Sequence, residues 1–400
     1  MGVYERLGVR PIMNVAGTIT RFGGALMEQE SPDAMNEAAK ESVRLDELQA
    51  AASKIIAEIT HAEAGIVTAG AAAALTLGTA ACLTGLNVAR MNRLPNTIGM
   101  PNEVIMAQHQ ISGYAHSIRA AGATIVEVGI PNDITSPGEV HIATVYDFES
   151  AITENTVAIA YACIPGSNPP LEQIIDIGKK YHIPVTLDAA NEVPPVENLH
   201  KFIDMGADLV AFSGGKGIRG PQASGILCGR RDLVAAAALQ NWDMGEPFDE
   251  WNPPPSLIPK ERLCGVPQHG IGRSMKITKE AIIGLLIALQ VLSEEGFAKR
   301  AEQLRVLLGS IQAKLEGIAG LELEVVEECE GGYPMLKVKV NKKVIGRSAA
   351  EVCKRLEDDG IYVWKKYLGR SIILVHSINM DEEMAKIVGE RLYIAITRTS

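Results

Sequence analysis

The chain lacks what nucleic-acid binding or a thiol-based metal site requires. Its 38 Lys and Arg residues are outnumbered by 48 Asp and Glu residues, which gives a net charge of −10. Because binding to phosphate backbones depends on clustered Lys and Arg, we expect no nucleic-acid partner. The six cysteines form no C-x-x-C pair and no close cluster with histidines. We therefore expect no metal site and interpret the cysteines as reduced, mostly buried thiols.

The chain also lacks a recognisable export or membrane segment. The N-terminal stretch "MGVYERLGVRPIMNVAG" has no long apolar run, so we expect a cytoplasmic protein. Residues 64–89 carry no charge over more residues than a membrane span needs. However, Ala, Gly and Thr dominate this segment, and such small side chains suit close packing inside a protein better than insertion into lipid. We predict a buried strand, turn and helix there, and no membrane partner.

Between residues 60 and 240, short β-rich runs alternate with helical segments. This alternation is typical of a mostly parallel sheet covered on both faces by helices. Helices are predicted over 171–182 and 196–206, where apolar residues recur at helical spacing. The fold class is therefore α/β, with a large seven-stranded domain and a smaller C-terminal domain. The seven predicted strands cover residues 64–69, 103–108, 124–129, 156–162, 184–189, 208–213 and 224–229.

The length of 400 residues exceeds the usual range of one domain. Residues 1–60 are predicted as an N-terminal arm with helices, and residues 61–275 as the large cofactor-binding domain. A long connecting helix is expected over 276–318. The remaining segment, 319–400, contains β-rich runs and the helical stretch "SAAEVCKRLEDDG", which fits a small α/β domain.

The stretch "FSGGKGIRGPQASGIL" (212–227) contains one lysine, Lys216, among glycines. A phosphate-binding P-loop requires G-x-x-x-x-G-K-[ST], but position 210 is Val and position 217 is Gly, so that motif is absent. The alternative is a covalent bond to a bulky planar cofactor, for which glycines would clear space around the amine. Lys216 is therefore the candidate for a lysine that holds pyridoxal 5'-phosphate as a Schiff base.

The ring of such a cofactor needs a carboxylate that keeps its pyridine nitrogen protonated. Asp188 ends a predicted strand one strand-helix-strand unit before Lys216, so both side chains are expected at the same edge of the sheet. Helix capping is the alternative role for this Asp. His109, directly after another predicted strand, is the candidate to cover the ring face, with Tyr114 and His116 as competitors.

The anionic groups of cofactor and substrate need donors of their own. A helix N-terminus with small side chains binds phosphate through free backbone N–H groups, although such turns also occur for packing alone. In "TAGAAAALTLGTAA" the candidate donors are Gly70, Ala71 and Ala72, and Ser213 can add a hydroxyl group. Arginine matches the geometry of substrate carboxylates and phosphates. The candidate arginines are Arg21, Arg273 and Arg370, each of which has a surface charge as its alternative role.

These segments resemble fold-type I pyridoxal-phosphate enzymes, and more narrowly the group that contains selenocysteine synthase (seryl-tRNA selenium transferase) and D-glucosaminate-6-phosphate ammonia-lyase. The likeness runs from "RPIMNVAGTITRFGG" through "TAGAAAALTL", "VTLDAANEVPP" and the Lys216 segment to "GRSMKITKEAIIGLL". It covers most of the chain up to about residue 290. The resemblance implies an aspartate aminotransferase-like fold, pyridoxal 5'-phosphate as cofactor, and a homodimer or a larger ring of dimers.

Within that group, the chain is more similar to the ammonia-lyases. Selenium transferases usually carry Asp before the lysine, where this chain has Gly215, and they bear an additional N-terminal tRNA-binding domain, whereas the core motif here begins at once. The resemblance implies that Lys216 acts as general base and acid at the substrate α-carbon. The expected substrate is a small hydroxylated amino acid, which would lose its β-hydroxyl group and yield a 2-keto acid and ammonia.

Other reactions remain open from the sequence. Racemisation needs a second acid on the opposite face, for which His109, Tyr114 and Tyr161 are candidates. Retro-aldol cleavage uses the same cofactor chemistry. A tRNA-dependent selenium transferase and a cofactor-binding protein without catalysis are the remaining alternatives.

Overall fold

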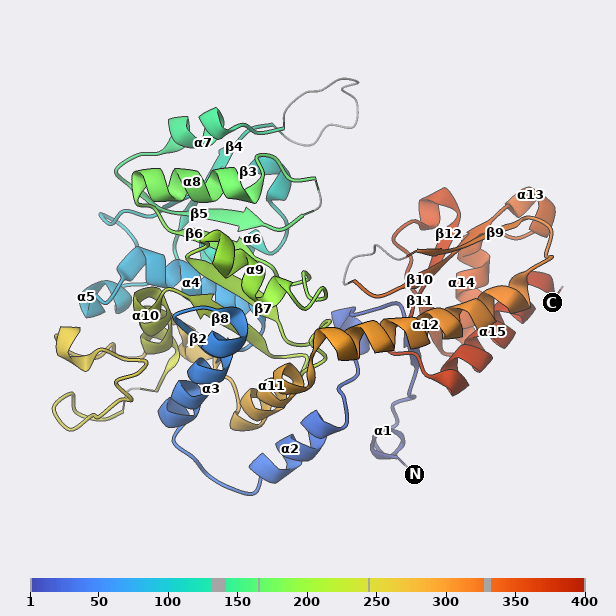
Figure 1. Ribbon diagram of the computed structural model, residues 1–400, viewed down its shortest axis with the longest axis horizontal. Coiled ribbons are helices and arrows are strands. Elements are labelled where there is room, and N and C mark those ends of the chain that lie inside the picture. The colour runs from blue at the N-terminus through green and yellow to red at the C-terminus, as the bar shows by residue number, and fades with distance from the viewer. Residues whose placement is uncertain (1, 131–141, 165, 244, 327–331, 399–400) are drawn as a thin grey trace. The chain divides into compact units, whose positions relative to one another are not determined.

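The computed structural model describes residues 2–130, 142–164, 166–243, 245–326 and 332–398. Its internal contacts divide the chain into two compact units (Figure 1). Unit 1 comprises residues 1–26, 194–196 and 292–400, and unit 2 comprises residues 27–193 and 197–291.

Unit 2 is built on one seven-stranded sheet with the strand order β2-β8-β7-β6-β5-β3-β4. β8 runs antiparallel to both of its neighbours, and the other pairs are parallel. The strands are β2 (Ala64–Thr68), β3 (Glu103–Ala107), β4 (Thr124–Val128), β5 (Thr156–Ala162), β6 (Val185–Asp188), β7 (Leu209–Ser213) and β8 (Gly225–Gly229). All seven predicted strands are confirmed, each to within one residue at its ends.

Two sets of helices pack on this sheet. α4 (Ala71–Thr84) contacts β5 to β8 and packs against α6 (Ala115–Ala120) and α10 (Arg231–Asn241). α3 (Leu45–Thr60) and α9 (Asn198–Met205) pack against each other, and α8 (Leu171–Tyr181) packs on β5 and β6. The remaining helices of unit 2 are α2 (Glu30–Ala38), α5 (Val88–Met91), α7 (Val145–Ala151) and α11 (Lys279–Val291).

The uncharged segment predicted to be buried forms β2 and α4. Every residue of β2 is buried, as are most residues of α4, so the prediction of a strand and a helix is confirmed. Among the described residues, no single helix combines the length and the apolar composition that crossing a membrane requires. Two consecutive helices, α11 and α12 (Glu294–Leu315), meet both criteria when they are taken together as a bent pair, by length and composition alone.

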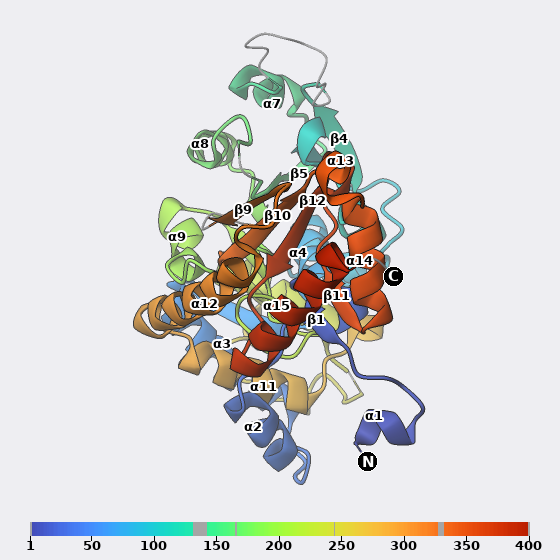
Figure 2. The same cartoon turned by 90° about the vertical axis from the view of Figure 1, so that its right-hand side faces the viewer.

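Unit 1 contains a three-stranded antiparallel sheet with the order β12-β10-β9. α12 packs on β9 and β10, and α14 (Ala349–Asp358) packs beside β12 (Figure 2). α15 (Glu382–Thr397) contacts both of these helices. The strands are β9 (Leu321–Val326), β10 (Met335–Val340) and β12 (Ile372–His376), and the short helices are α1 (Val3–Arg6) and α13 (Lys342–Ile345).

Two features of the structure differ from the pattern expected from the sequence. β11 (Ile361–Val363) lies outside the three-stranded sheet and pairs in parallel with β1 (Met13–Val15), so that the first 26 residues belong to the same unit as the C-terminus. The single helix expected over 276–318 is two helices, because the Ser293 hydroxyl accepts a hydrogen bond from the Gly296 N–H at 3.1 Å and caps α12.

Candidate active site

The residues predicted to hold the cofactor ring follow strands that end at one edge of the unit 2 sheet. β6 ends at Asp188, β7 ends at Ser213, and Lys216 lies in the turn that follows β7. His109 comes two residues after the end of β3. Because β3, β6 and β7 run in the same direction, their carboxyl ends share this edge, which is where open α/β sheets bind ligands.

Asp188 is mostly buried and lies within electrostatic range of Lys216. Burial raises the pKa of its carboxyl group, while a hydrogen bond from the Ala190 N–H, at 3.1 Å, and the charge of Lys216 act in the opposite direction. A carboxylate whose charge is opposed by burial is stabilised by any further cation placed beside it. The protonated nitrogen of a pyridine ring is such a cation, so the site fits the predicted cofactor.

Asp188 also lines a small cavity with Tyr161, one of the candidates for a second acid, and with Gln110, which the sequence did not single out. Gln110 accepts a hydrogen bond from the Ala162 N–H at 3.2 Å through Oε1, whereas its buried Nε2 has no partner of acceptable geometry in the described part of the chain. Tyr161 donates to the carbonyl of Pro169 at 3.3 Å, and burial raises its pKa to about 12. Tyr161 therefore keeps its proton at neutral pH.

His109 offers a neutral ring at this edge. Burial lowers its pKa, and both ring nitrogens are buried without a hydrogen-bond partner among the described residues. Buried polar atoms of this kind usually contact something, so a bound molecule or water is expected beside them. The competing side chains Tyr114 and His116 are exposed. The geometry favours His109 for the ring-covering role, which stays a prediction.

The start of α4 has the form expected of a phosphate site. Gly70 precedes α4 with φ 90° and ψ 167°, and no side chain caps the helix. A Cβ atom built on Gly70 would meet nothing within 4 Å. The first N–H groups of a helix have no partner within it, so those of α4 can bind an anion. Thr68 and Ser213 both pair with Gly225, which brings this helix start to the edge that carries Lys216.

Two of the glycines beside Lys216, Gly214 and Gly215, pack closely against the chain that follows. A Cβ atom on Gly215 would lie 2.4 Å from the Cα atom of Gln222, and one on Gly214 would lie 2.1 Å from the Ser224 hydroxyl oxygen. These distances are far below van der Waals contact, so the glycines allow the chain to fold back closely on itself. For Gly214 and Gly215 the contacts therefore indicate close packing of the chain, and the interpretation that the glycines clear space around the amine stays a prediction.

Arg219 is a further residue of this loop that the sequence did not single out. It is buried, adopts the left-handed backbone conformation with φ 59°, and forms an ion pair with Glu28 at 2.5 Å. Its backbone N–H donates to the carbonyl of Lys216 at 2.9 Å. Arg219 thus connects the lysine-bearing turn to the segment before α2.

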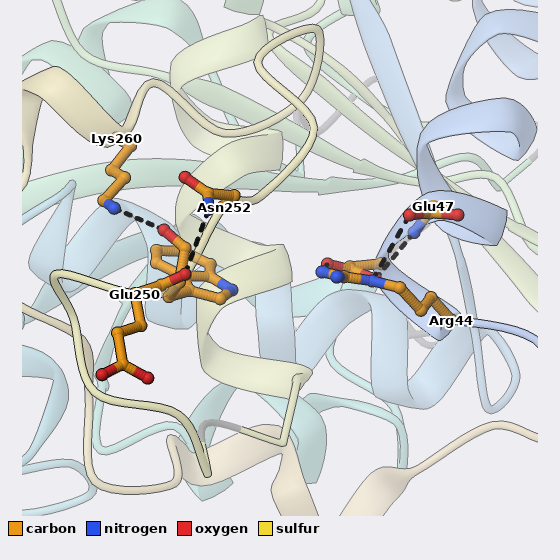
Figure 3. A network of polar contacts seen from close by, with 7 residues as sticks. Arg44, Glu47, Glu250, Asn252 and Lys260 are labelled. Atoms are coloured by element: carbon orange, nitrogen blue, oxygen red, sulfur yellow. Dashed lines mark hydrogen bonds and ion pairs between the residues drawn. The ribbon is translucent and has the colours of Figure 1, made fainter.

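The three predicted substrate arginines lie in different surroundings. Arg273 pairs with Asp243 at 3.1 Å and lines a cavity of about 590 Å³, together with Trp242 and Trp251. None of the residues lining this cavity lines the one beside Asp188. Figure 3 shows polar contacts at the border of the cavity that Arg273 lines, including the 3.4 Å ion pair between Arg44 and Glu47.

Arg21 and Arg370 belong to unit 1, where both are exposed. The Arg21 guanidinium lies 4.7 Å from the ring centre of Phe22, and that of Arg370 lies 5.8 Å from the ring centre of Tyr367. Each guanidinium group therefore lies within cation–π distance of an aromatic ring nearby in the sequence. Substrate binding by any of the three arginines stays a prediction.

The fold is that of a fold-type I enzyme that uses pyridoxal 5'-phosphate. The chain belongs to the class-V aminotransferase family, whose model matches residues 46–370. It is 30% identical to the 5'-C-glycyluridine monooxygenase-decarboxylase of a Streptomyces species, over 95% of this chain and 89% of that one. It is 29% identical to the D-glucosaminate-6-phosphate ammonia lyase of Salmonella typhimurium, over 98% of both chains.

More distant relatives and a solved structure agree with this family. The L-seryl-tRNA(Sec) selenium transferase of Mannheimia succiniciproducens is 25% identical over 84% of this chain and 71% of its own. A solved structure of D-glucosaminate-6-phosphate ammonia-lyase superposes with a TM-score of 0.77 at 27% identity, covering 99% of this chain and 98% of that one. The group to which the sequence was assigned is therefore confirmed.

Proposed function

We propose that this enzyme removes ammonia from a small hydroxylated amino acid and produces a 2-keto acid. The observation that carries the proposal is the similarity to D-glucosaminate-6-phosphate ammonia lyase over 98% of both chains. The buried carboxylate of Asp188 and its electrostatic coupling to Lys216 support the same chemistry. The substrate itself is proposed only as a class, because specificity depends on the shape of the pocket rather than on these shared residues.

The proposed roles follow from the position of each side chain. When bound, pyridoxal 5'-phosphate supplies an electron-withdrawing ring that stabilises negative charge on the substrate α-carbon. Asp188 would keep the ring nitrogen protonated. Lys216 would hold the cofactor, and its amine would take the α-proton of the substrate and donate a proton to the departing β-hydroxyl group. The hydroxyl group leaves as water, and hydrolysis with one water then yields the 2-keto acid and ammonia, so no oxidant is needed.

Other groups of the chain would bind and orient the cofactor and the substrate. His109 would cover the face of the ring, and the N–H groups of Gly70, Ala71 and Ala72 and the Ser213 hydroxyl would hold the cofactor phosphate. The remaining anions of the substrate are bound by arginine. The proposed arginines are Arg21, Arg273 and Arg370.

The test is a substrate screen with the holoenzyme. A panel of D- and L-hydroxyamino acids, including phosphorylated sugar amino acids, is incubated while ammonia and 2-keto acid are measured. Equal release of both products from at least one compound is expected. Exchange of the α-hydrogen in deuterated water without ammonia release would instead support a racemase, and release of an aldehyde would support an aldolase. Tight binding of seryl-tRNA at physiological salt would contradict the proposal.

Oxidative decarboxylation of an amino acid is the second candidate function. The similarity to a monooxygenase-decarboxylase, at 30% identity over 95% of this chain, favours it. Such a reaction consumes O₂ and releases CO₂, whereas the elimination consumes neither gas. Ammonia release that is unchanged under anaerobic conditions supports elimination, and substrate-dependent uptake at an oxygen electrode supports the second candidate.

We also propose that the enzyme assembles as a homodimer or a larger ring of dimers and has neither a nucleic-acid nor a membrane partner. The acidic net charge of −10 supports the exclusion of nucleic acid. Analytical ultracentrifugation of the holoenzyme measures the assembly, and a monomer at micromolar concentration would contradict it.

A further inference from the structure

Two histidines and an aspartate that are far apart in the sequence meet on the surface of unit 2. His61 directly follows α3, and His200 and Asp204 lie on α9. The Nδ1 atom of His61 is 2.9 Å from Oδ1 and 3.1 Å from Oδ2 of Asp204, and the Nδ1 atom of His200 is 2.9 Å from Oδ2. Both imidazoles therefore present the same type of nitrogen to one carboxylate.

The backbone fixes how these side chains meet. His61 ends α3 in the left-handed conformation, with φ 56°. His200 and Asp204 are four residues apart on one helix and therefore project from the same face. The two imidazole rings stack with their centres 4.5 Å apart and an angle of 26° between their planes. As a result, one ligand atom from each of the three side chains lies within 4.8 Å of the other two.

This geometry is close to that of a zinc site. Zinc binds His nitrogen and Asp oxygen at about 2.0–2.2 Å, so that neighbouring ligand atoms around a tetrahedral ion lie about 3.4 Å apart. The hydrogen-bonded distances of 2.9–3.1 Å are a few tenths of an ångström shorter. The side chains are 36–53% exposed, so they can separate by this amount, and water can complete the coordination.

We propose that His61, His200 and Asp204 bind one divalent transition-metal ion of the zinc type. Each ring would offer its Nδ1 lone pair and keep its proton on Nε2, and the two hydrogen bonds to Asp204 would be replaced by bonds to the ion. Imidazole and carboxylate ligands suit such an ion. The ion would connect the end of α3 to α9. The expectation of no metal site rested on spacing along the sequence, which cannot reveal residues brought together by folding.

The site lies away from the proposed catalytic residues. His61 precedes the start of β2, and Asp204 precedes the start of β7, so both lie at the amino edge of these strands. Lys216 and Gly70 follow the carboxyl ends of the same two strands. The length of a strand, about 3.3 Å per residue, therefore separates the metal site from the cofactor site. Variants of the metal site should leave turnover and cofactor content unchanged.

The experiment is a calorimetric titration of untagged, chelator-treated holoenzyme with ZnCl₂. Wild type is expected to bind one ion with an affinity that His61→Asn lowers by at least about tenfold. His182→Asn is the matched control, because His182 is exposed and also ends a helix in the left-handed conformation, with φ 57°. Asn tolerates this conformation, so neither variant is expected to strain the backbone.

A second variant and a second measurement keep the test independent of folding defects. Asp204→Asn preserves side-chain volume but removes the anionic ligand. ZnCl₂ is expected to raise the melting temperature of wild type and of His182→Asn, but not of His61→Asn or Asp204→Asn. Wild type that binds no zinc, or His61→Asn and Asp204→Asn variants that bind it as tightly as wild type, would overturn the proposal. None of these outcomes depends on the reaction that the enzyme catalyses.

Discussion

Two glycine-bearing segments border the same edge of the large sheet, and they differ in what surrounds the glycine. In the turn that carries Lys216, a Cβ atom on Gly215 would lie 2.4 Å from the backbone of Gln222. At the start of α4, a Cβ atom on Gly70 would meet nothing within 4 Å, although the φ of 90° favours glycine. Gly225 joins the two segments, because its own Cβ atom would lie 2.5 Å from the carbonyl carbon of Gly70.

The difference shows that glycine allows close packing in the lysine-bearing turn, whereas at the start of α4 it leaves the helix N–H groups accessible. The lysine-bearing turn is closed by its own backbone, which holds Lys216 at a defined position. The start of α4 is open, which leaves its N–H groups available to an anion. Substitutions on the two sides should therefore affect different quantities: catalysis or stability in the turn, and cofactor affinity at the helix.

Lys216→Ala has the largest expected effect. Turnover should fall on the order of 10⁴-fold, because the general acid and base is removed, while the melting temperature of the apoprotein should change little, since the glycines close the turn without the lysine. Borohydride reduction followed by peptide mass spectrometry should find the cofactor on Lys216 in wild type and on no lysine in the variant. Lys201→Ala, on the exposed surface of α9, is the control. Cofactor attached to another lysine would show that the turn has been misassigned.

Asp188→Asn should lower turnover on the order of a thousandfold, because a neutral amide no longer holds the ring nitrogen protonated. The same substitution should increase the stability of the apoprotein at neutral pH. Burial raises the pKa of Asp188 in the folded chain, so the folded state binds more protons than the unfolded state and wild type loses stability as pH rises above about 4. The amide introduced by Asp188→Asn does not titrate, so the variant does not lose stability for this reason as the pH rises.

Both effects of Asp188→Asn can be measured on the same preparation. Steady-state kinetics report turnover, and urea unfolding of the apoprotein at several pH values reports stability. Asp176→Asn, which changes an exposed Asp on α8, should alter neither. Near-normal turnover of Asp188→Asn would remove this residue from the mechanism.

Gly215→Ala tests the closed segment. The added methyl group meets backbone atoms of Gln222, which cannot rotate away, so we expect a loss of about 1–3 kcal/mol in the free energy of unfolding. Urea unfolding measures the change. Gly309→Ala, inside α12 with nothing within 4 Å of the new Cβ atom, should instead gain about 0.5–1 kcal/mol. Equal changes in the two variants would contradict the packing explanation.

Gly70→Ala tests the open segment, and the smallest expected effect is its change in cofactor affinity. No clash is present, so the cost in stability is backbone strain alone, about 1–3 kcal/mol for a side chain in this conformation. The start of α4 should shift, and the dissociation constant of the cofactor should rise about tenfold. Absorbance titration of the apoprotein with pyridoxal 5'-phosphate measures it. Unchanged cofactor affinity in this variant would contradict the proposal that the start of α4 binds the phosphate.

The sheet and much of the candidate site could be predicted because their signals are local. Each strand of unit 2 is a short apolar run, and β7 is buried from Leu209 to Phe212, so composition alone marked it. Lys216 and Asp188 could be proposed because each lies at the end of such a run or shortly after it. Gln110 and Arg219 could not be proposed in this way. Gln110 has a buried Nε2 atom without a hydrogen-bond partner among the described residues, and Arg219 forms an ion pair with Glu28, and neither feature leaves a pattern along the chain.

The sequence by itself determined the fold class, the order of the strands along the chain and the family, because periodicity and short motifs act over a few residues. The tertiary structure alone decided why Gly215 is glycine, that β1 pairs with β11, and that His61 meets Asp204. Each of these features is a contact between residues that are brought together only when the chain folds. Such a contact depends on the distance between two residues in space, and their separation along the sequence does not specify that distance.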